Sequence, residues 1–578
     1  MSATINSVLA GSVGLTKSGA GNLILGGTNT YTGATSVIGG GTLQIASLSN
    51  INTTGTISID AASTLKITGS VSPTNALTIG TGGGTIDTGA FNFTQATGAV
   101  TLSGILTKTG SGDLTLGGTP TSGAGAGFIV SAGRVLLGTT TTLLITGNST
   151  LTGDLVLNAA SRLNVDGASI TVSGAGAIKI TTTGSILSNT SGLTGGTISA
   201  PIVLNSGAAA VTAGSWSAST YTKASFVTSI GSTKGAASIP GKLTINSVIS
   251  GNADLMISNS ATSGGGGTTI LGGVSTYSGN TIIEASAPDA NNPVAANLQI
   301  GINNALPTTT GLIFNPSTVA GVASVVDLNG KNLEVAYLSD GNTGTTTKPS
   351  ITNLNATGST LTLSGATTLG VGFSGVISGT TGTISLVKSG AGTQILSGAN
   401  TFTGSVSING GILSVGSIGN GGVTGNLGAA TNAAANLVLN GGTLQYTGTG
   451  TTSSNRNFTL GTSGGTIDVA AASGTFTLSG SATLSGSNTA RTLTLTSSTG
   501  AQNGALSGTL SDNGTGATAV TKTGSNTWTL SGNNTYTGAT TVSAGTLTAG
   551  HAAAFGTSTV TINGGTLALA ALIITNNV

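Results

Sequence analysis

A repeated motif constrains this chain more than any other feature of its sequence. Residues 15–45 read LTKSGAGNLILGGTNTYTGATSVIGGGTLQI, and residues 386–415 and 520–547 read LVKSGAGTQILSGANTFTGSVSINGGILSV and VTKTGSNTWTLSGNNTYTGATTVSAGTL. Each copy places a lysine 14 residues before an aromatic residue, in the pairs Lys17 and Tyr31, Lys388 and Phe402, and Lys522 and Tyr536. Self-similarity of this kind is the signature of repeat architectures.

Further copies of the motif are less complete. A fourth begins at Leu106, contains Lys108, and carries extra Gly and Ala residues before Phe128. A fifth, at 268–283, keeps Tyr277 and lacks the lysine. A second unit recurs as LTIGTGGGTIDT and FTLGTSGGTIDV, so repetition extends through much of the chain.

Within each repeat the apolar residues alternate with polar ones. Leu23 and Leu25, then Leu43 and Ile45, are separated by clusters of Gly, Asn and Thr. This period of two predicts short β-strands, and no segment has the 3.6-residue period of an amphipathic helix. Long Gly-rich turns favour a solenoid over a hairpin meander, because hairpins prefer two-residue turns. We expect inward Leu, Ile and Val to form the core, with Leu25, Leu43, Leu413 and Leu547 buried.

The predicted fold is therefore all-β: one elongated parallel β-helix over 1–578, a continuous rod with protruding loops. The repeat is weakest at about 201–240, which holds Trp216 and Tyr221, and at about 284–320, which is rich in proline. Proline cannot donate to a strand ladder, so we expect loop-bearing or irregular coils in both stretches.

The composition excludes several classes of protein. Charged residues are 5% of 578, far below the roughly 25% of ordinary soluble domains. The net charge is 15 − 13 = +2 with no basic stripe, which argues against nucleic acid as a partner. The N-terminal residues show no secretory signal, and the longest apolar run, Leu567–Ile574, is too short for a membrane-spanning helix, so no membrane insertion is expected.

The segments GLTKSGAGNLILGGTNTYTGATSV, FSGVISGTTGTISLVKSGAGTQILSGANTFTG and TYTGATTVSAGTLTAGHAAAFGTSTVTINGGTL resemble the autotransporter-associated, or passenger-associated, β-helix repeat family. The unit VVDLNGKNLEVAYLSDGNTG at 325–344 is similar to the family's DLNG unit. The resemblance implies a right-handed parallel β-helix that is displayed on a cell surface or secreted. The chain shows neither the signal peptide nor the translocator domain of a full autotransporter, so a virion fibre or appendage stays an alternative.

Residues for catalysis or metal binding are scarce. His551 is the single histidine and there is no cysteine, so we expect no metal site and no cofactor. The acidic residues are spread nearly singly, and Asp87 and Asp468 occupy equivalent positions in the GGTID unit, which indicates a turn role. The tightest acidic group, Asp327, Glu334 and Asp340, could meet across adjacent coils, as a β-helix carbohydrate-active enzyme would need. We expect no catalytic residue.

Two repeat-locked sets remain as candidate glycan-contact or edge positions. Lysines at a sheet edge discourage unwanted strand pairing, or contact an anionic glycan, whereas the aromatic residues pack in the core or stack on sugars. These candidates are Lys17, Lys108, Lys388, Lys522, Tyr31, Tyr277, Phe402 and Tyr536.

The expected function is that of a non-enzymatic structural or adhesive protein, extracellular or at a cell surface. Solenoid ends normally carry polar capping coils, which neither the start of this sequence nor its end, GGTLALAALIITNNV, shows. We therefore expect the chain to partner itself, as an oligomer or fibre, or a capping protein, with surface glycans as a further partner.

Overall fold

Short parallel β-strands make up the chain in the computed structural model. The structure describes residues 1–117, 120–138, 141–158, 161–165, 168–180, 186–189, 196–204, 227–232, 242–258, 267–284, 297–315, 323–340, 347–366, 372–499 and 502–569. Over these residues the only helices are the 3₁₀ turns η1 (Leu48–Asn50) and η2 (Ala434–Asn436). The prediction of an all-β parallel solenoid is confirmed.

The described residues up to Ala305 form one compact unit and those from Leu306 onward form another, here called unit 1 and unit 2. Continuity of one solenoid over 1–578 stays a prediction. Of the two stretches expected to be irregular, residues 205–226, 233–240, 285–296 and 316–320 lie outside the described residues. The parts that are described there include the strands β26 (Val227–Ser232) and β32 (Asn297–Ile300).

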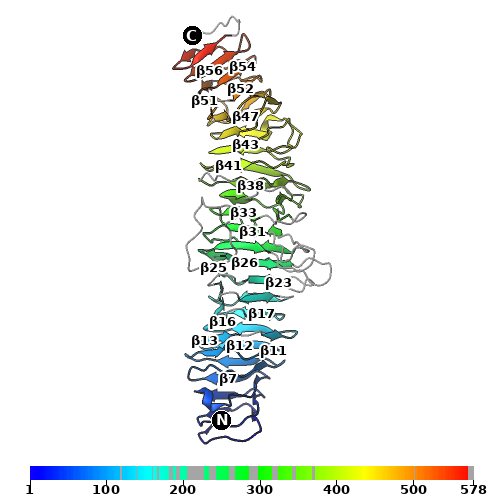
Figure 1. The fold of residues 1–578 in the computed structure, drawn as a ribbon, viewed down its shortest axis with the longest axis vertical. Coiled ribbons are helices and arrows are strands. Elements are labelled where there is room, and N and C mark those ends of the chain that lie inside the picture. Colours follow the sequence, from blue (N-terminus) through cyan, green and yellow to red (C-terminus); the bar gives the residue numbers. More distant parts are fainter. Residues whose placement is uncertain are drawn as a thin grey trace. The chain divides into compact units, whose positions relative to one another are not determined.

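In unit 1, successive coils add strands to the same parallel sheets; β7 (Ser63–Ile67) and β12 (Ile105–Thr109), labelled in Figure 1, belong to one of these sheets. The first sheet holds β1 (Ser2–Ile5), β3 (Asn22–Leu25), β5 (Thr42–Ile45), β7 (Ser63–Ile67), β9 (Gly84–Asp87), β12 (Ile105–Thr109), β15 (Gly127–Val130), β18 (Ser149–Leu151), β21 (Ser169–Val172), β24 (Gly196–Ile198), β27 (Lys242–Ile245), β30 (Thr268–Leu271) and β32. The second holds β2 (Leu15–Lys17), β4 (Thr35–Val37), β6 (Ile57–Ile59), β8 (Leu77–Ile79), β11 (Val100–Leu102) and β14 (Thr121–Ser122).

Two more sheets complete unit 1. One holds β10 (Phe93–Gln95), β13 (Asp113–Leu116), β16 (Arg134–Leu137), β19 (Asp154–Leu157), β22 (Ile178–Ile180), β25 (Ile202–Leu204) and β28 (Ile249–Gly251). The other holds β17 (Thr142–Ile145), β20 (Arg162–Val165), β23 (Ile186–Asn189), β26, β29 (Asp254–Ser258) and β31 (Thr281–Glu284).

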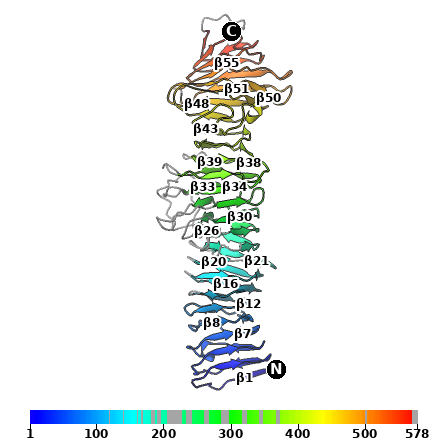
Figure 2. The ribbon, with the colours of Figure 1, turned by 90° about the vertical axis from the view of Figure 1, so that its right-hand side faces the viewer.

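Unit 2 has the same construction, and Figure 2 shows β48 (Gly465–Val469), β51 (Arg491–Thr496) and β55 (Thr540–Val542), which belong to one sheet. It begins with β33 (Gly311–Asn315), β34 (Val325–Asp327), β36 (Tyr337–Ser339), β37 (Ser350–Thr352) and β39 (Val376–Ser378). One sheet then holds β35 (Leu333–Val335), β38 (Ser359–Leu363), β40 (Ile384–Lys388), β42 (Val406–Ile408), β44 (Leu437–Leu439), β47 (Phe458–Leu460) and β50 (Ala482–Leu484).

Two further sheets complete unit 2. One holds β41 (Thr393–Leu396), β43 (Ile412–Val415), β45 (Thr443–Tyr446), β48 (Gly465–Val469), β51 (Arg491–Thr496), β53 (Thr518–Lys522), β55 (Thr540–Val542) and β57 (Val560–Ile562). The other holds β46 (Thr452–Ser454), β49 (Thr475–Leu478), β52 (Asn503–Leu506), β54 (Thr527–Leu530), β56 (Thr546–Ala549) and β58 (Thr566–Ala568).

The core consists of aliphatic side chains stacked from coil to coil. In β7 every second residue, from Ser63 to Ile67, is buried, as expected for a strand with one face on the core. The parallel register places Leu43 against Leu65, and Leu65 against Ile86, in adjacent strands. The predicted core residues Leu25, Leu43, Leu413 and Leu547 are at most 1% exposed, so that prediction is confirmed.

Glycine allows the coils to approach closely. A Cβ at Gly538 would lie 2.4 Å from the carbonyl oxygen of Thr518 in the preceding coil. Gly133 lies in a turn with φ of +65°, a backbone conformation that residues with a Cβ rarely adopt.

Within the described part of the chain, no helix has the length and apolar character needed to cross a membrane.

Candidate functional site

The four repeat-locked lysines lie in the interior. Their exposed fractions are 8% for Lys17, 0% for Lys108, 2% for Lys388 and 0% for Lys522. Each ends, or nearly ends, a strand at an inward position; Lys108 pairs with Ile86 on one side and Val130 on the other. The aliphatic stems therefore continue the core columns, and whether any of these lysines contacts a glycan stays a prediction.

The ammonium of Lys108 is held by backbone carbonyl groups. Its Nζ donates hydrogen bonds to the carbonyl oxygens of Thr109 and Gly110, both at 2.8 Å, and of Ala132 at 3.2 Å. Thr109 and Gly110 belong to its own turn, and Ala132 follows the paired strand of the next coil. The lysine thus ties two consecutive coils together.

The same arrangement recurs in unit 2. Lys522 Nζ donates to the carbonyl oxygens of Thr523, Gly524 and Ala544 at 2.7, 2.8 and 3.1 Å. Lys388 Nζ donates to those of Gly390 and, at 3.4 Å, of Gly410 in the next coil. Lys17, in unit 1, differs from these lysines. Its Nζ donates within its own turn, to the carbonyl oxygens of Ser18 at 2.9 Å and Gly19 at 2.5 Å.

Burial without a counterion in contact lowers the pKa of Lys108, Lys388 and Lys522. The pKa of Lys108, Lys388 and Lys522 falls from 10.5 to about 8, chiefly through loss of hydration. At Lys108 the charges of Asp113 and Asp87 oppose this shift. Space for the ammonium depends on glycine, since a Cβ at Gly133 would lie 3.0 Å from Lys108 Nζ, and one at Gly545 2.8 Å from Lys522 Nζ.

The repeat-locked aromatic residues are also buried. Tyr31, Tyr277, Phe402 and Tyr536 are between 0% and 4% exposed. Each tyrosine hydroxyl shares a hydrogen bond with the threonine four residues later: Tyr31 with Thr35 at 2.6 Å, Tyr277 with Thr281, and Tyr536 with Thr540 at 2.8 Å. Burial raises the pKa of Tyr536 to about 12, against the smaller effect of its hydrogen bonds.

The copy without a tyrosine hydroxyl also lacks the threonine. Phe402 is followed four residues later by Val406, which is 1% exposed. A threonine there would bury a hydroxyl that the phenylalanine ring could not pair, at a cost in stability. The two positions therefore change together, and these aromatic residues pack in the interior. Sugar stacking by them stays a prediction.

An asparagine in the same motif joins three coils, a role that the sequence interpretation missed. Asn534 Oδ1 accepts from the backbone N–H of Leu510 in the preceding coil at 2.9 Å, and its Nδ2 donates to the carbonyl of Ala554 in the next at 2.6 Å. Two other copies do the same: Asn29 with Leu9 and Asn50, and Asn400 with Ile377 and Asn426. The sequence does contain a signal for this role, because in these three copies an asparagine stands two residues before the aromatic residue.

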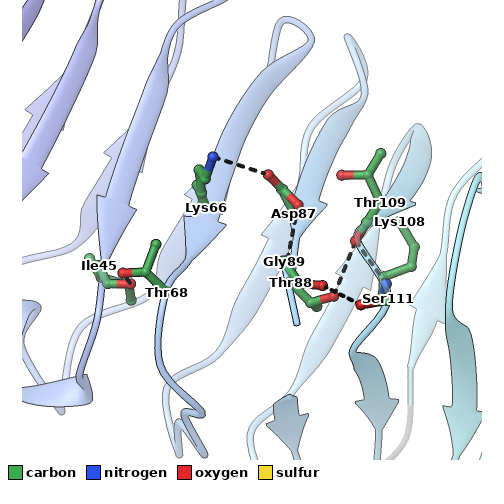
Figure 3. A network of polar contacts seen from close by, with 9 residues as sticks. All are labelled: Ile45, Lys66, Thr68, Asp87, Thr88, Gly89, Lys108, Thr109 and Ser111. Atoms are coloured by element: carbon green, nitrogen blue, oxygen red, sulfur yellow. Dashed lines mark hydrogen bonds and ion pairs between the residues drawn. The ribbon is translucent and has the colours of Figure 1, made fainter. Parts of the chain in front are cut away.

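Charged side chains of unit 1 pair along one sheet. Arg134 donates to both carboxylate oxygens of Asp113, at 2.9 and 2.6 Å, and these contacts raise its pKa. Lys179 lies 2.6 Å from Asp154 two strands further on. Figure 3 shows a comparable contact in the first sheet, where Lys66 lies 3.8 Å from Asp87. Such exposed pairs contribute little stability.

The two acids of the GGTID unit have structural roles. Asp87 Oδ1 accepts from the backbone N–H of Gly89 in the turn that follows, at 3.0 Å, beside the Thr88 hydroxyl in Figure 3. Asp468 accepts from the backbone N–H of Ser498 and the side-chain amide of Gln445, both at 2.8 Å.

Asp327, Glu334 and Asp340 do not form one site. Asp327 ends β34 and Glu334 lies in β35, in different sheets. Asp340 Oδ2 accepts from the backbone N–H and hydroxyl of Ser374, and Lys348 donates to that hydroxyl at 2.8 Å. The serine is thereby held between an amine and a carboxylate, which ties three segments together.

His551 is exposed in a turn, where its Nδ1 accepts from the backbone N–H of Ala553. Among the described residues, no group of three or more His, Cys, Asp or Glu side chains is placed to hold a metal ion. The lysine turns offer only carbonyl acceptors that the lysines already use. The repeated lysines and asparagines form a coil-locking site, in which side chains of one coil bind backbone groups of adjacent coils.

Comparison with known proteins identifies the repeat. The passenger-associated-transport-repeat family matches residues 15–45, 106–137, 264–285, 386–415 and 520–549. These are the copies that contain Lys17, Lys108, Tyr277, Lys388 and Lys522, so the resemblance drawn from the sequence is confirmed. The chain is a parallel β-solenoid that carries passenger-associated transport repeats.

Among curated proteins, the chain is similar to the adhesin BmaC autotransporter of Brucella suis biovar 1 (strain 1330). The two are 34% identical over 264 residues, which is 45% of this chain and 7% of the adhesin. The chain therefore aligns with only a small part of that protein's length. No solved structure matches the chain.

Proposed function

We propose that this chain is a non-enzymatic, adhesive part of a passenger-type protein displayed outside the cell. The observation that carries the proposal is the 34% identity to an autotransporter adhesin over 264 residues. The fold supports it, because the asparagines and three of the lysines bind backbone groups of neighbouring coils, and the tyrosines pair with threonines inside the core. Recognition is then left to the outer surface, as on other rigid scaffolds.

An adhesion assay with the purified chain tests this proposal. Fluorescent beads coated with the chain are incubated with an epithelial cell monolayer, beside beads coated with the heat-unfolded chain at equal density. We expect the folded chain to retain many more beads. Equal retention of both kinds of bead would contradict the adhesive function.

The same assay tests the absence of a catalytic contribution. We expect His551→Ala, and Asp327→Asn, Glu334→Gln and Asp340→Asn combined, to leave adhesion unchanged in protein that remains folded. General acid–base catalysis needs acids and bases positioned together. Turnover of a polysaccharide that these changes abolish would instead favour a carbohydrate-active enzyme. The comparisons support neither that alternative nor a virion appendage.

Self-association is a separate proposal. Among the described strands, β1 pairs with β3 alone, and residues 1–16 contain no charged side chain that would discourage pairing with another chain. We expect the purified chain to form larger species as its concentration rises in sedimentation velocity. Sedimentation as a monomer at every concentration would contradict self-association and leave a capping protein as the expected partner.

A further inference from the structure

The part of unit 2 from residue 349 to residue 569 presents an almost uncharged surface. The sequence from 349 to 569 contains six charged residues: Lys388, Arg456, Asp468, Arg491, Asp512 and Lys522. Five of them are at most 4% exposed. Among the described residues of this stretch, Asp512 is half-buried and the other five charged side chains are buried. None of the six is exposed.

The interior charges are satisfied within the protein. The Arg456 guanidinium donates to the carbonyl oxygens of Gly419, Gly428 and Ala430, at 2.9, 2.7 and 3.3 Å. The carboxylate of Asp512 accepts from the backbone N–H of Thr518 and from the N–H and hydroxyl of Thr537, at 2.6 to 3.0 Å. These charges are therefore engaged and do not project toward a partner.

A column of threonines follows the coils of this uncharged surface. Adjacent strands pair Thr443 with Thr466, and the pairing continues one strand at a time to the end of the sheet. The threonine column consists of Thr443, Thr466, Thr494, Thr521, Thr541 and Thr561, in β45, β48, β51, β53, β55 and β57. All six side chains are half-buried or exposed, and none of their hydroxyls takes part in a hydrogen bond of the described residues.

The column repeats one chemical group at a fixed interval. Stacked parallel strands lie about 4.8 Å apart, so the hydroxyls are offered at that spacing along the coil axis. Each threonine adds a methyl group, which suits the C–H faces of sugar rings. Every contact is weak by itself, but contacts to one polymer add through their shared attachment.

Resting on the adhesive function proposed above, we infer that the threonine column binds a neutral, hydroxyl-rich polysaccharide that lies along the coils. Because no cation is exposed among the described residues from 349 to 569, this surface gives no counter-charge for a sulfated or uronic acid polymer. It also removes the electrostatic contribution that would make binding depend on salt.

Binding to immobilised polysaccharides tests this inference. The probes are dextran and mannan as neutral polymers and heparin as an acidic one, at low and at high salt. We expect the full chain to bind at least one neutral polymer with the same affinity at both salt concentrations, and to bind it more tightly than heparin. Tighter binding to heparin, or binding to no polymer, would overturn the inference.

A variant without the hydroxyls locates the site. Thr466→Val, Thr494→Val and Thr521→Val together keep the β-branched shape and remove three hydrogen-bonding groups, so affinity should fall about tenfold or more. The matched control is Thr42→Val, Thr64→Val and Thr85→Val, an in-register column in unit 1 beside Lys66 and Asp87. Thermal unfolding verifies that both variants are folded. An undiminished affinity of the first variant, or an equal loss in the control, would overturn the location.

These results are distinguishable from failure of the adhesive function. Beads that adhere to cells although the chain ignores neutral polymers would overturn the inference alone. Beads that fail to adhere although the chain binds dextran or mannan through the threonine column would support the inference and contradict the cell-adhesive function.

Discussion

The side-chain nitrogen of Lys108 lies 3.2 Å from the carbonyl oxygen of Ala132, a residue of the next coil. Lys522 and Ala544 repeat this relationship at 3.1 Å. The contact that completes each ammonium's set of acceptors therefore forms only when the following coil is in place. An isolated buried charge is costly, so this arrangement favours the stacked state over a frayed one.

Lys108→Met should destabilise unit 1 when stability is measured near pH 10.5, where the lowered pKa of the lysine no longer opposes folding. Methionine keeps most of the apolar stem but leaves the carbonyls of Thr109, Gly110 and Ala132 without their donor, at a cost of about 1–3 kcal/mol. Chemical denaturation measures the change. The control is Lys66→Met, which removes only an exposed ion pair and should change stability by less than about 1 kcal/mol. Equal effects of the two changes would show that the carbonyl contacts contribute nothing.

Stability should rise with pH between about 8 and 10. Lys108, Lys388 and Lys522 have a pKa of about 8 in the folded protein and 10.5 when unperturbed. In this window the unfolded chain binds more protons than the folded one, so the free energy of unfolding increases as pH rises. Above pH 10 the effect of Tyr536 is opposite, because its pKa rises from 10 to about 12 on folding.

Denaturation midpoints at a series of pH values measure this dependence. In a chain with all three lysines changed to methionine, the midpoint should no longer rise between pH 8 and 10. A midpoint that falls in this range in the unaltered chain would contradict the assigned direction.

Phe402 and Val406 should be energetically coupled. Phe402→Tyr alone and Val406→Thr alone each place a hydroxyl in the interior without the partner that Tyr536 finds in Thr540. Both single changes should destabilise the protein, and the double change should recover about 1 kcal/mol relative to their sum. A double-mutant cycle measured by denaturation provides the number, and strict additivity would refute the pairing.

Gly538→Ala should destabilise unit 2 by about 1–3 kcal/mol, because the added methyl group would overlap the backbone of the preceding coil. Gly123 provides the control, since its nearest neighbours would lie 3.6 Å or more from a Cβ, and its φ is not positive. Thermal unfolding compares the two variants. If Gly123→Ala were the more damaging change, close coil approach at Gly538 would not be the cause.

The sequence predicts much of the fold because the periodicity of apolar residues carries it. Alternation around Leu43 and Leu547 is a local property, and identical repeats must stack with their apolar faces inward. The burial of Lys17 is harder to predict. The alternation in Leu-Thr-Lys does place Lys17 on the same strand face as Leu15, but a lysine is normally expected at the surface. Its acceptors are backbone carbonyls, which every residue has and no sequence pattern marks.

The acidic residues and the asparagines show which contacts the sequence could not predict. Asp327 and Glu334 are close in sequence, but a turn places them in different sheets, so proximity along the chain did not predict a shared site. Asn400 contacts coils on both sides through its amide, and this requires knowing which backbone groups face it. Residue type and spacing indicate that these positions matter, while the coil register determines how.

The central claim is that repeated interior residues lock the coils while the outer surface binds. It is tested most directly by measuring bead adhesion and thermal unfolding on one preparation in which Lys108, Lys388 and Lys522 are all changed to methionine. The account predicts a lower unfolding temperature near pH 10.5, and unchanged adhesion at neutral pH at a temperature where the variant is folded. Unchanged stability with adhesion lost would contradict it, and would assign ligand contact to the lysines themselves.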